Sequence, residues 1–81
     1  MTQRNDKPFF ISSKEDCKYC RLAKTAMQQR NIGYIESVLN DDGLRTLKEK
    51  GYTTVPQIWH GDVHVGGFEA LVKYLDQHFP E

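Results

Sequence analysis

Residues 9–20 read FFISSKEDCKYC, a short apolar run that is followed, after the polar residues SSKED, by a Cys-Lys-Tyr-Cys quartet. The quartet holds Cys17 and Cys20, the only cysteines of the chain. The apolar run predicts a buried strand and the residues after it have helical spacing, so the quartet falls where a strand passes into a helix. A helix N-terminus stabilises an anion, and the thiolate is the form of cysteine that attacks disulfides. The pattern therefore predicts a redox pair, although half of a zinc site has the same spacing.

The length and charge of the chain limit its class. Eighty-one residues predict one small domain that spans residues 1–81. Eleven basic and eleven acidic side chains balance, so no net field favours nucleic acid or a membrane surface. Residues 1–7 are polar and lack the apolar core of a signal peptide, and no apolar run reaches the length of a membrane span. We therefore expect a cytoplasmic protein, where a purely structural disulfide is rare.

The rest of the chain alternates between strand-like and helix-like segments. Asp16 offers a cap for the first helix, and Asn31-Ile32-Gly33 ends it. The predicted elements are, in chain order, strand 9–11, helix 17–30, strand 34–38, helix 40–50, strands 57–59 and 63–65 around a turn, and helix 68–79. The order β-α-β-α-β-β-α predicts an α/β fold, a four-stranded mixed sheet with helices on both faces.

Four motifs at the junctions of these elements narrow the interpretation. They are Lys14-Glu15-Asp16, the Cys-x-Tyr-Cys core, Thr54-Val55-Pro56 and Gly66-Gly67-Phe68-Glu69. With the element order, they resemble the glutaredoxins, small dithiol proteins of the thioredoxin superfamily, over residues 9–79. The resemblance implies a thioredoxin-like fold and an enzyme, a thiol–disulfide oxidoreductase, that reduces protein disulfides and glutathione mixed disulfides. It also implies glutathione as co-substrate, no tightly bound cofactor, ribonucleotide reductase among the protein substrates, and a monomer.

The two cysteines differ in their expected roles. Cys17, as the first helical residue, should be the more exposed and act as the nucleophile, whereas Cys20 lies nearer the core and should be the resolving thiol. Lys14 and Lys18 place positive charge nearby, which favours the Cys17 thiolate. We therefore expect Cys17 to attack the substrate disulfide and Cys20 to release the reduced substrate.

The resemblance also implies a glutathione site around the pair. Its expected residues are Lys14, Tyr19, Thr54, Val55, Pro56, Gly67, Phe68 and Glu69. By resemblance, a cis Pro56 turns the backbone N–H and C=O of Val55 toward the ligand, which pairs with them as an added strand pairs with a sheet edge. Lys14 would meet the glycine carboxylate. The N–H groups of the helix that opens at Gly67, together with Glu69, would meet the γ-glutamyl end.

Three positions depart from the glutaredoxin pattern. Lys18 stands where the common quartet has proline, Tyr52 stands where relatives often have arginine, and Phe68 replaces a small residue. The missing arginine weakens glutathione binding unless Lys48 or Lys50 substitutes for it. These changes leave open a redoxin that takes electrons from thioredoxin reductase and passes them to ribonucleotide reductase.

Metal binding is the alternative from another class. Cys17 and Cys20 with His60 and His64 make a nominal zinc set, but the gap between the two pairs is far longer than in a zinc finger. An iron–sulfur cluster bridged between two subunits occurs in some glutaredoxin relatives, mostly with a single thiol, and Cys20 argues against it. We therefore expect no metal site.

Overall fold

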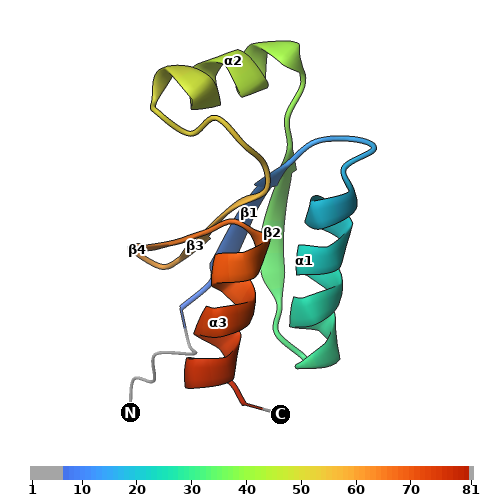
Figure 1. The fold of residues 1–81 in the computed structure, drawn as a ribbon, viewed down its shortest axis with the longest axis vertical. Coiled ribbons are helices and arrows are strands. Elements are labelled where there is room, and N and C mark those ends of the chain that lie inside the picture. The colour runs from blue at the N-terminus through green and yellow to red at the C-terminus, as the bar shows by residue number, and fades with distance from the viewer. Residues whose placement is uncertain (1–6, 81) are drawn as a thin grey trace.

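The computed structural model describes residues 7–80. In this range the chain forms β1 (Phe9–Ser13), α1 (Lys18–Gln29), β2 (Tyr34–Val38), α2 (Asp41–Glu49), β3 (Gln57–His60), β4 (Val63–Gly66) and α3 (Phe68–His78) (Figure 1). This order confirms the predicted one. Among the described residues, no helix combines the length and the apolar character needed to cross a membrane. The expectation that the chain begins without a signal peptide falls mostly outside the described residues.

The four strands of the described chain form one mixed sheet, as predicted, and the strands lie in the order β2-β1-β3-β4. β1 and β2 run parallel, with Phe9 opposite Tyr34, and α1 supplies the crossover that a parallel pair needs. β1 and β3 are antiparallel, with Phe9 opposite His60, and β3 and β4 form an antiparallel hairpin. The hairpin turns at Gly61, whose φ of 59° suits glycine.

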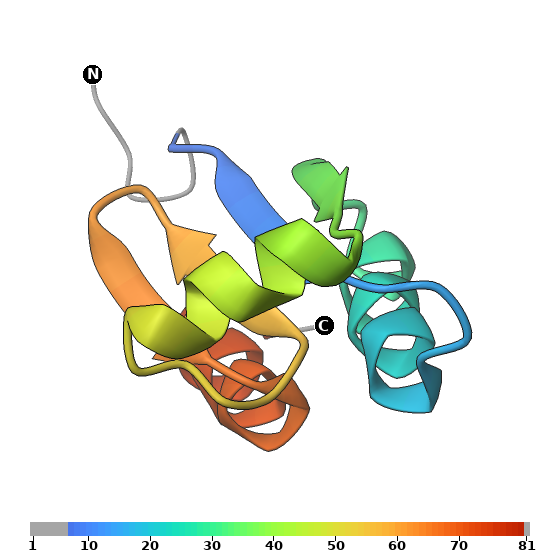
Figure 2. The ribbon, with the colours of Figure 1, turned by 90° about the horizontal axis from the view of Figure 1, so that it is seen from above.

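The core lies between one face of the sheet and the helices α1 and α3, which pack side by side (Figures 1 and 2). Alternation along β1 places Phe9 and Ile11 in this core, whereas Phe10 points to the other face and is 37% exposed. The buried core residues are Phe9, Ile11, Ala23, Met27, Ile58, Leu71 and Leu75. This packing fixes α1, and therefore the cysteines at its start, relative to the sheet.

α2 differs from the other two helices in its position. It crosses the end of the sheet at which β1 and β2 finish (Figures 1 and 2). Within Asp41–Glu49 only Leu44 and Leu47 are large and apolar; both are half-buried, and no residue of this helix is fully buried. Two leucines offer too little apolar surface to cover a sheet face.

Candidate active site

Cys17 and Cys20 form a disulfide at the start of α1, with their Cα atoms 5.2 Å apart. Cys17 is 8% exposed and Cys20 is 1% exposed, so Cys17 is the more accessible sulfur, as predicted. The difference arises because α1 turns Cys20 toward the core while Cys17 stays at its tip. Cys17 is therefore the more exposed cysteine of the two, and Cys20 lies in the interior.

The helix begins one residue later than predicted. Cys17 is the N-cap rather than the first helical residue, with extended backbone angles of φ −114° and ψ 110°. Its Sγ accepts a hydrogen bond from the backbone N–H of Cys20 at 3.2 Å. Asp16, the expected cap, instead has a φ of 55°, a left-handed conformation that aspartate tolerates in turns. The sulfur of Cys17 thus lies where a capping oxygen normally does, and the N–H that it accepts favours a negative charge there.

A first groove runs from Cys17 toward α2. Its lining includes Lys14, Cys17, Tyr19, Lys48, Tyr52 and Val55. Lys18 also lines it, with its Nζ 5.8 Å from the centre of the Tyr19 ring. The charged residues that line this groove are three lysines, Lys14, Lys18 and Lys48, and one carboxylate, Asp16. The groove therefore carries net positive charge beside the accessible sulfur, which favours a thiolate.

A second groove adjoins the first and reaches the start of α3. Tyr19, Thr54, Val55 and Pro56 line one part of it, and Gly67, Phe68 and Glu69 from the start of α3 line the rest. Tyr19, Thr54 and Val55 line both grooves, and the ring centres of Tyr19 and Phe68 are 6.0 Å apart. The fold thus brings all eight predicted glutathione residues to two adjoining grooves beside Cys17.

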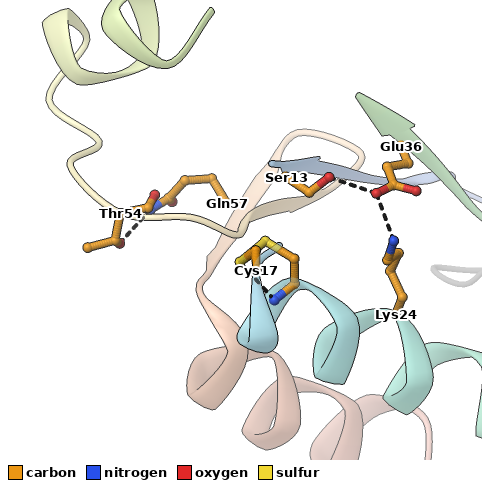
Figure 3. The surroundings of a disulfide bond; sticks show 7 residues. Ser13, Cys17, Lys24, Glu36, Thr54 and Gln57 are labelled. Atoms are coloured by element: carbon orange, nitrogen blue, oxygen red, sulfur yellow. Dashed lines mark hydrogen bonds and ion pairs between the residues drawn. A yellow bond between two sulfur atoms is a disulfide. The ribbon is translucent and has the colours of Figure 1, made fainter. Parts of the chain in front are cut away.

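The segment before β3 is held by a glutamine that the sequence analysis did not single out. The Val55–Pro56 peptide bond is cis, as the resemblance implied. Gln57 is 7% exposed, and its Nε2 donates to the carbonyl oxygen of Thr54 at 3.0 Å and to its hydroxyl at 3.3 Å (Figure 3). Its Oε1 accepts from Nε2 of His64 at 2.7 Å. These bonds anchor the backbone directly before Val55. The sequence carried one signal for this role, an amide side chain at the first position of a buried strand.

A polar cluster on the other side of the disulfide was also missed. Glu36 of β2 accepts hydrogen bonds from Oγ of Ser13 at 2.7 Å and from Nζ of Lys24 at 2.9 Å (Figure 3). The Ser13 hydrogen bond, followed by that of Lys24, holds the pKa of Glu36 below its ordinary value, although burial acts in the opposite direction. An acidic residue inside a strand of aromatic and β-branched residues was the signal for this cluster.

The two histidines of the nominal zinc set lie on opposite faces of the sheet. His60 is 2% exposed and stacks on Phe9 in the core, with its Nδ1 2.7 Å from the hydroxyl of Tyr74. His64 lies against the ring of Trp59, with centres 5.1 Å apart. Within residues 7–80, no three or more His, Cys, Asp or Glu side chains gather so as to hold a metal ion. The cysteines and histidines therefore do not assemble into one site.

Comparison with known proteins agrees with this geometry. The model of the glutaredoxin family matches residues 9–65. The chain belongs to the glutaredoxin family. It is 38% identical over 69 residues to a glutaredoxin of Pseudomonas aeruginosa, a match that covers 79% of this chain and 80% of that protein. It is 33% identical over 64 residues to glutaredoxin 3 of Escherichia coli, which covers 75% of this chain and 77% of that protein.

Solved glutaredoxins share the fold. Glutaredoxin 1 from Francisella tularensis superposes with a TM-score of 0.78 at 26% identity, covering 86% of this chain and 93% of that one. A buckwheat glutaredoxin–glutathione complex superposes with a TM-score of 0.72 at 28% identity, covering 94% of this chain and 76% of that one. The thioredoxin-like fold expected from the sequence is thereby confirmed.

The chain also matches a much longer protein, a hybrid peroxiredoxin of Haemophilus influenzae. The two are 33% identical over 67 residues, which cover 80% of this chain, but the chain spans only 28% of that protein's length. The family and the Cys17–Cys20 pair identify the glutaredoxin domain as a thiol–disulfide oxidoreductase. Its two sulfurs cycle between a dithiol and a disulfide and carry two electrons in each cycle.

Proposed function

We propose that this glutaredoxin domain is glutathione-dependent and reduces protein disulfides and glutathione mixed disulfides. The observation that supports this most is the pair of adjoining grooves beside Cys17. Lys14 and Lys48 line the first groove, and the start of α3 with Glu69 lines the second. Glutathione has a carboxylate at each end and an ammonium group at one, so it needs cations or N–H groups at both ends and an acid at one. The two grooves supply these groups on either side of Val55.

The proposed reaction begins at Cys17. Its thiolate attacks one sulfur of a protein disulfide, that S–S bond breaks, and the departing substrate thiolate takes a proton from water. The Cys20 thiolate then attacks Cys17, which forms the intramolecular disulfide and releases the second substrate thiol. One glutathione thiolate opens this disulfide, leaving glutathione bound to Cys17, and a second removes it as glutathione disulfide. Two electrons thus pass from two glutathione molecules to the substrate.

Glutathione mixed disulfides follow a shorter route in this proposal. Cys17 attacks the glutathione sulfur, the protein thiol leaves, and a second glutathione regenerates Cys17. Cys20 has no role in this route, because the intramolecular disulfide never forms. A Cys20→Ser variant should therefore keep deglutathionylation and lose most reduction of protein disulfides, whereas Cys17→Ser loses both.

The choice of glutathione over thioredoxin reductase as electron source rests on the first groove. Tyr52 occupies the position where relatives often have arginine, and its ring packs on Trp59 with centres 5.6 Å apart. Lys48 lines the same groove and supplies a cation there, whereas Lys50 is not among its lining residues. The proposal also takes ribonucleotide reductase as one protein substrate, a monomeric state and a cytoplasmic location, as expected from the sequence.

The experiment measures turnover of a glutathione mixed disulfide with either glutathione and glutathione reductase or thioredoxin reductase as the reducing system. We expect turnover in the glutathione arm and a KM about fivefold higher in Lys14→Glu, since reversing one exposed charge changes binding by about 1 kcal/mol. Lys73→Glu, which reverses an exposed lysine on α3, is the matched control and should leave the KM unchanged. Turnover only with thioredoxin reductase would withdraw the glutathione site. An equal effect of both variants would show that Lys14 does not meet the ligand.

A further inference from the structure

Ser13, Lys24 and Glu36 form a polar cluster that the proposed reaction does not use. Glu36 accepts from both partners, at 2.7 Å from Ser13 Oγ and 2.9 Å from Lys24 Nζ. Ser13 is only 1% exposed, and the side chains of Lys24 and Glu36 are 27% and 24% exposed. A half-buried ion pair of this kind is less screened by solvent than a fully exposed one. Its two charges can therefore shift the pKa of titratable groups close to them.

The neighbouring group is Cys20. Lys24 follows Cys20 by four residues on α1, so the two side chains project from the same side of that helix. Cys20, Lys24 and Glu36 line a third groove, which shares Lys14, Asp16 and Cys17 with the first groove but contains no residue of the Val55 segment. Figure 3 shows Ser13, Lys24 and Glu36 together on one side of the disulfide, with Thr54 and Gln57 on the other.

The remaining charged residues of this groove are Lys14, Glu15, Asp16 and Arg21. All four are exposed, and they carry two positive and two negative charges. Water and salt screen exposed charges, and charges of opposite sign offset each other. Lys24 and Glu36, held together by a hydrogen bond and partly buried, are the two charged residues of this groove that are not exposed.

We propose that Lys24 and Glu36 are positioning residues for the resolving step, Lys24 favouring the thiolate of Cys20 and Glu36 opposing it. This inference rests on the proposed function only through the role of Cys20. In the resolving step, Cys20 loses its proton to water in the groove that Lys24 and Glu36 line, and its thiolate attacks Sγ of Cys17. The Cys17–Cys20 bond forms, the bond between Cys17 and substrate breaks, and the substrate leaves as a thiolate. The ion pair thus sets how readily the mixed disulfide is resolved.

The test removes one charge at a time, in Lys24→Met and Glu36→Gln, in a Cys17→Ser background where Cys20 is the only thiol. The thiolate of Cys20 is followed by its ultraviolet absorbance as the pH is raised, which does not require a reagent to reach the buried sulfur. We expect the midpoint of the Cys20 titration to rise in Lys24→Met and to fall in Glu36→Gln, each by about half a pH unit. A nearby positive charge lowers the pKa of a thiol and a nearby negative charge raises it.

Opposite shifts separate this role from a structural one. Both substitutions break the same ion pair, so a loosened structure would move the two midpoints in the same direction. Arg45→Met and Asp42→Asn provide the matched control, since they split an exposed ion pair on α2 and should move neither midpoint. Shifts in the same direction, or no shift, would overturn the proposal. None of these outcomes depends on glutathione, so they stand apart from the test of the proposed function.

A second readout uses the intact dithiol. With Cys17 and Cys20 both present, Lys24→Met should slow reduction of a protein disulfide near neutral pH about threefold, in line with the expected shift in thiolate fraction. With Cys20→Ser as background, the same substitution should leave turnover of a glutathione mixed disulfide unchanged. An equal loss in both assays would mean that Lys24 acts on Cys17 or on folding, which contradicts the proposal.

Discussion

The hydrogen bond from the Cys20 N–H to the Cys17 sulfur can be removed without touching Cys17. Replacing Cys20 by proline deletes that N–H, and replacing it by serine keeps it, while both variants lack the second thiol. The first backbone bond of α1 is donated by Arg21 to the carbonyl of Cys17, so the Cys20 N–H has no carbonyl partner to lose. Proline at this third helical position therefore costs no hydrogen bond within the helix, but it restricts the backbone of Tyr19 before it, so the fold of the variant is checked directly.

The magnitude follows from the geometry. The Cys20 nitrogen lies 3.2 Å from Sγ of Cys17, and Cys17 as a residue is only 8% exposed, so water replaces the bond only in part. A hydrogen bond to a charged group contributes about 1.5–3 kcal/mol, and one pKa unit corresponds to about 1.36 kcal/mol. We take the lower end and expect the Cys17 alkylation midpoint about one pH unit higher in Cys20→Pro than in Cys20→Ser. The helix dipole is present in both variants and cancels from the comparison.

The assay is the rate of alkylation of Cys17 by iodoacetamide as a function of pH, with circular dichroism as the check that both variants keep α1. A difference under about 0.3 pH units between two folded variants would refute the reasoning, because the N–H would then contribute almost nothing to the thiolate. A midpoint near the free-cysteine value of about 8.5 in Cys20→Ser would also contradict it.

Two further predictions concern the clusters that flank the disulfide. Ser13→Ala should lose stability at neutral pH but little at an acidic pH below the lowered pKa of Glu36, because Ser13 lowers that pKa and the stabilisation disappears as Glu36 is protonated. Urea unfolding at both pH values measures this, with Ser12→Ala on the same strand as control; an equal difference at both pH values would exclude Glu36 as the cause. Gln57→Leu should raise the KM for a glutathione mixed disulfide without moving the Cys17 alkylation midpoint, because it frees the carbonyl of Thr54 but leaves α1 intact. A shifted midpoint would show that the substitution disturbs α1 as well.

The elements and the redox pair could be predicted from the sequence because both depend on short-range features. A short apolar run at residues 9–11 indicates a strand, apolar residues recur at helical spacing in α1, and both patterns can be read without knowledge of their partners. The separation of three residues between Cys17 and Cys20 at a helix start brings their Cα atoms to 5.2 Å whatever surrounds them. The start of the helix was placed one residue too early, since cysteine is not a usual capping residue.

The position of α2 and the polar clusters could not be predicted in the same way. α2 was recognised as a helix from its cap and its leucines, but its place at the end of the sheet depends on how little apolar surface it offers compared with α1 and α3. Gln57 and His64 meet because the pairing of β3 with β4 places His64 opposite Trp59, two residues along β3 from Gln57. No local pattern in the chain reports that register.

By itself, then, the sequence determined that this chain forms a thioredoxin-like arrangement with two cysteines at the start of its first helix. Only the tertiary structure decided which N–H contacts the Cys17 sulfur and which charges flank each thiol. The physical reason is the range of the interactions. Caps, turns and hydrophobic periods act over a few residues, whereas Ser13 and Glu36 are 23 residues apart and meet only when two strands pair and pack under α1.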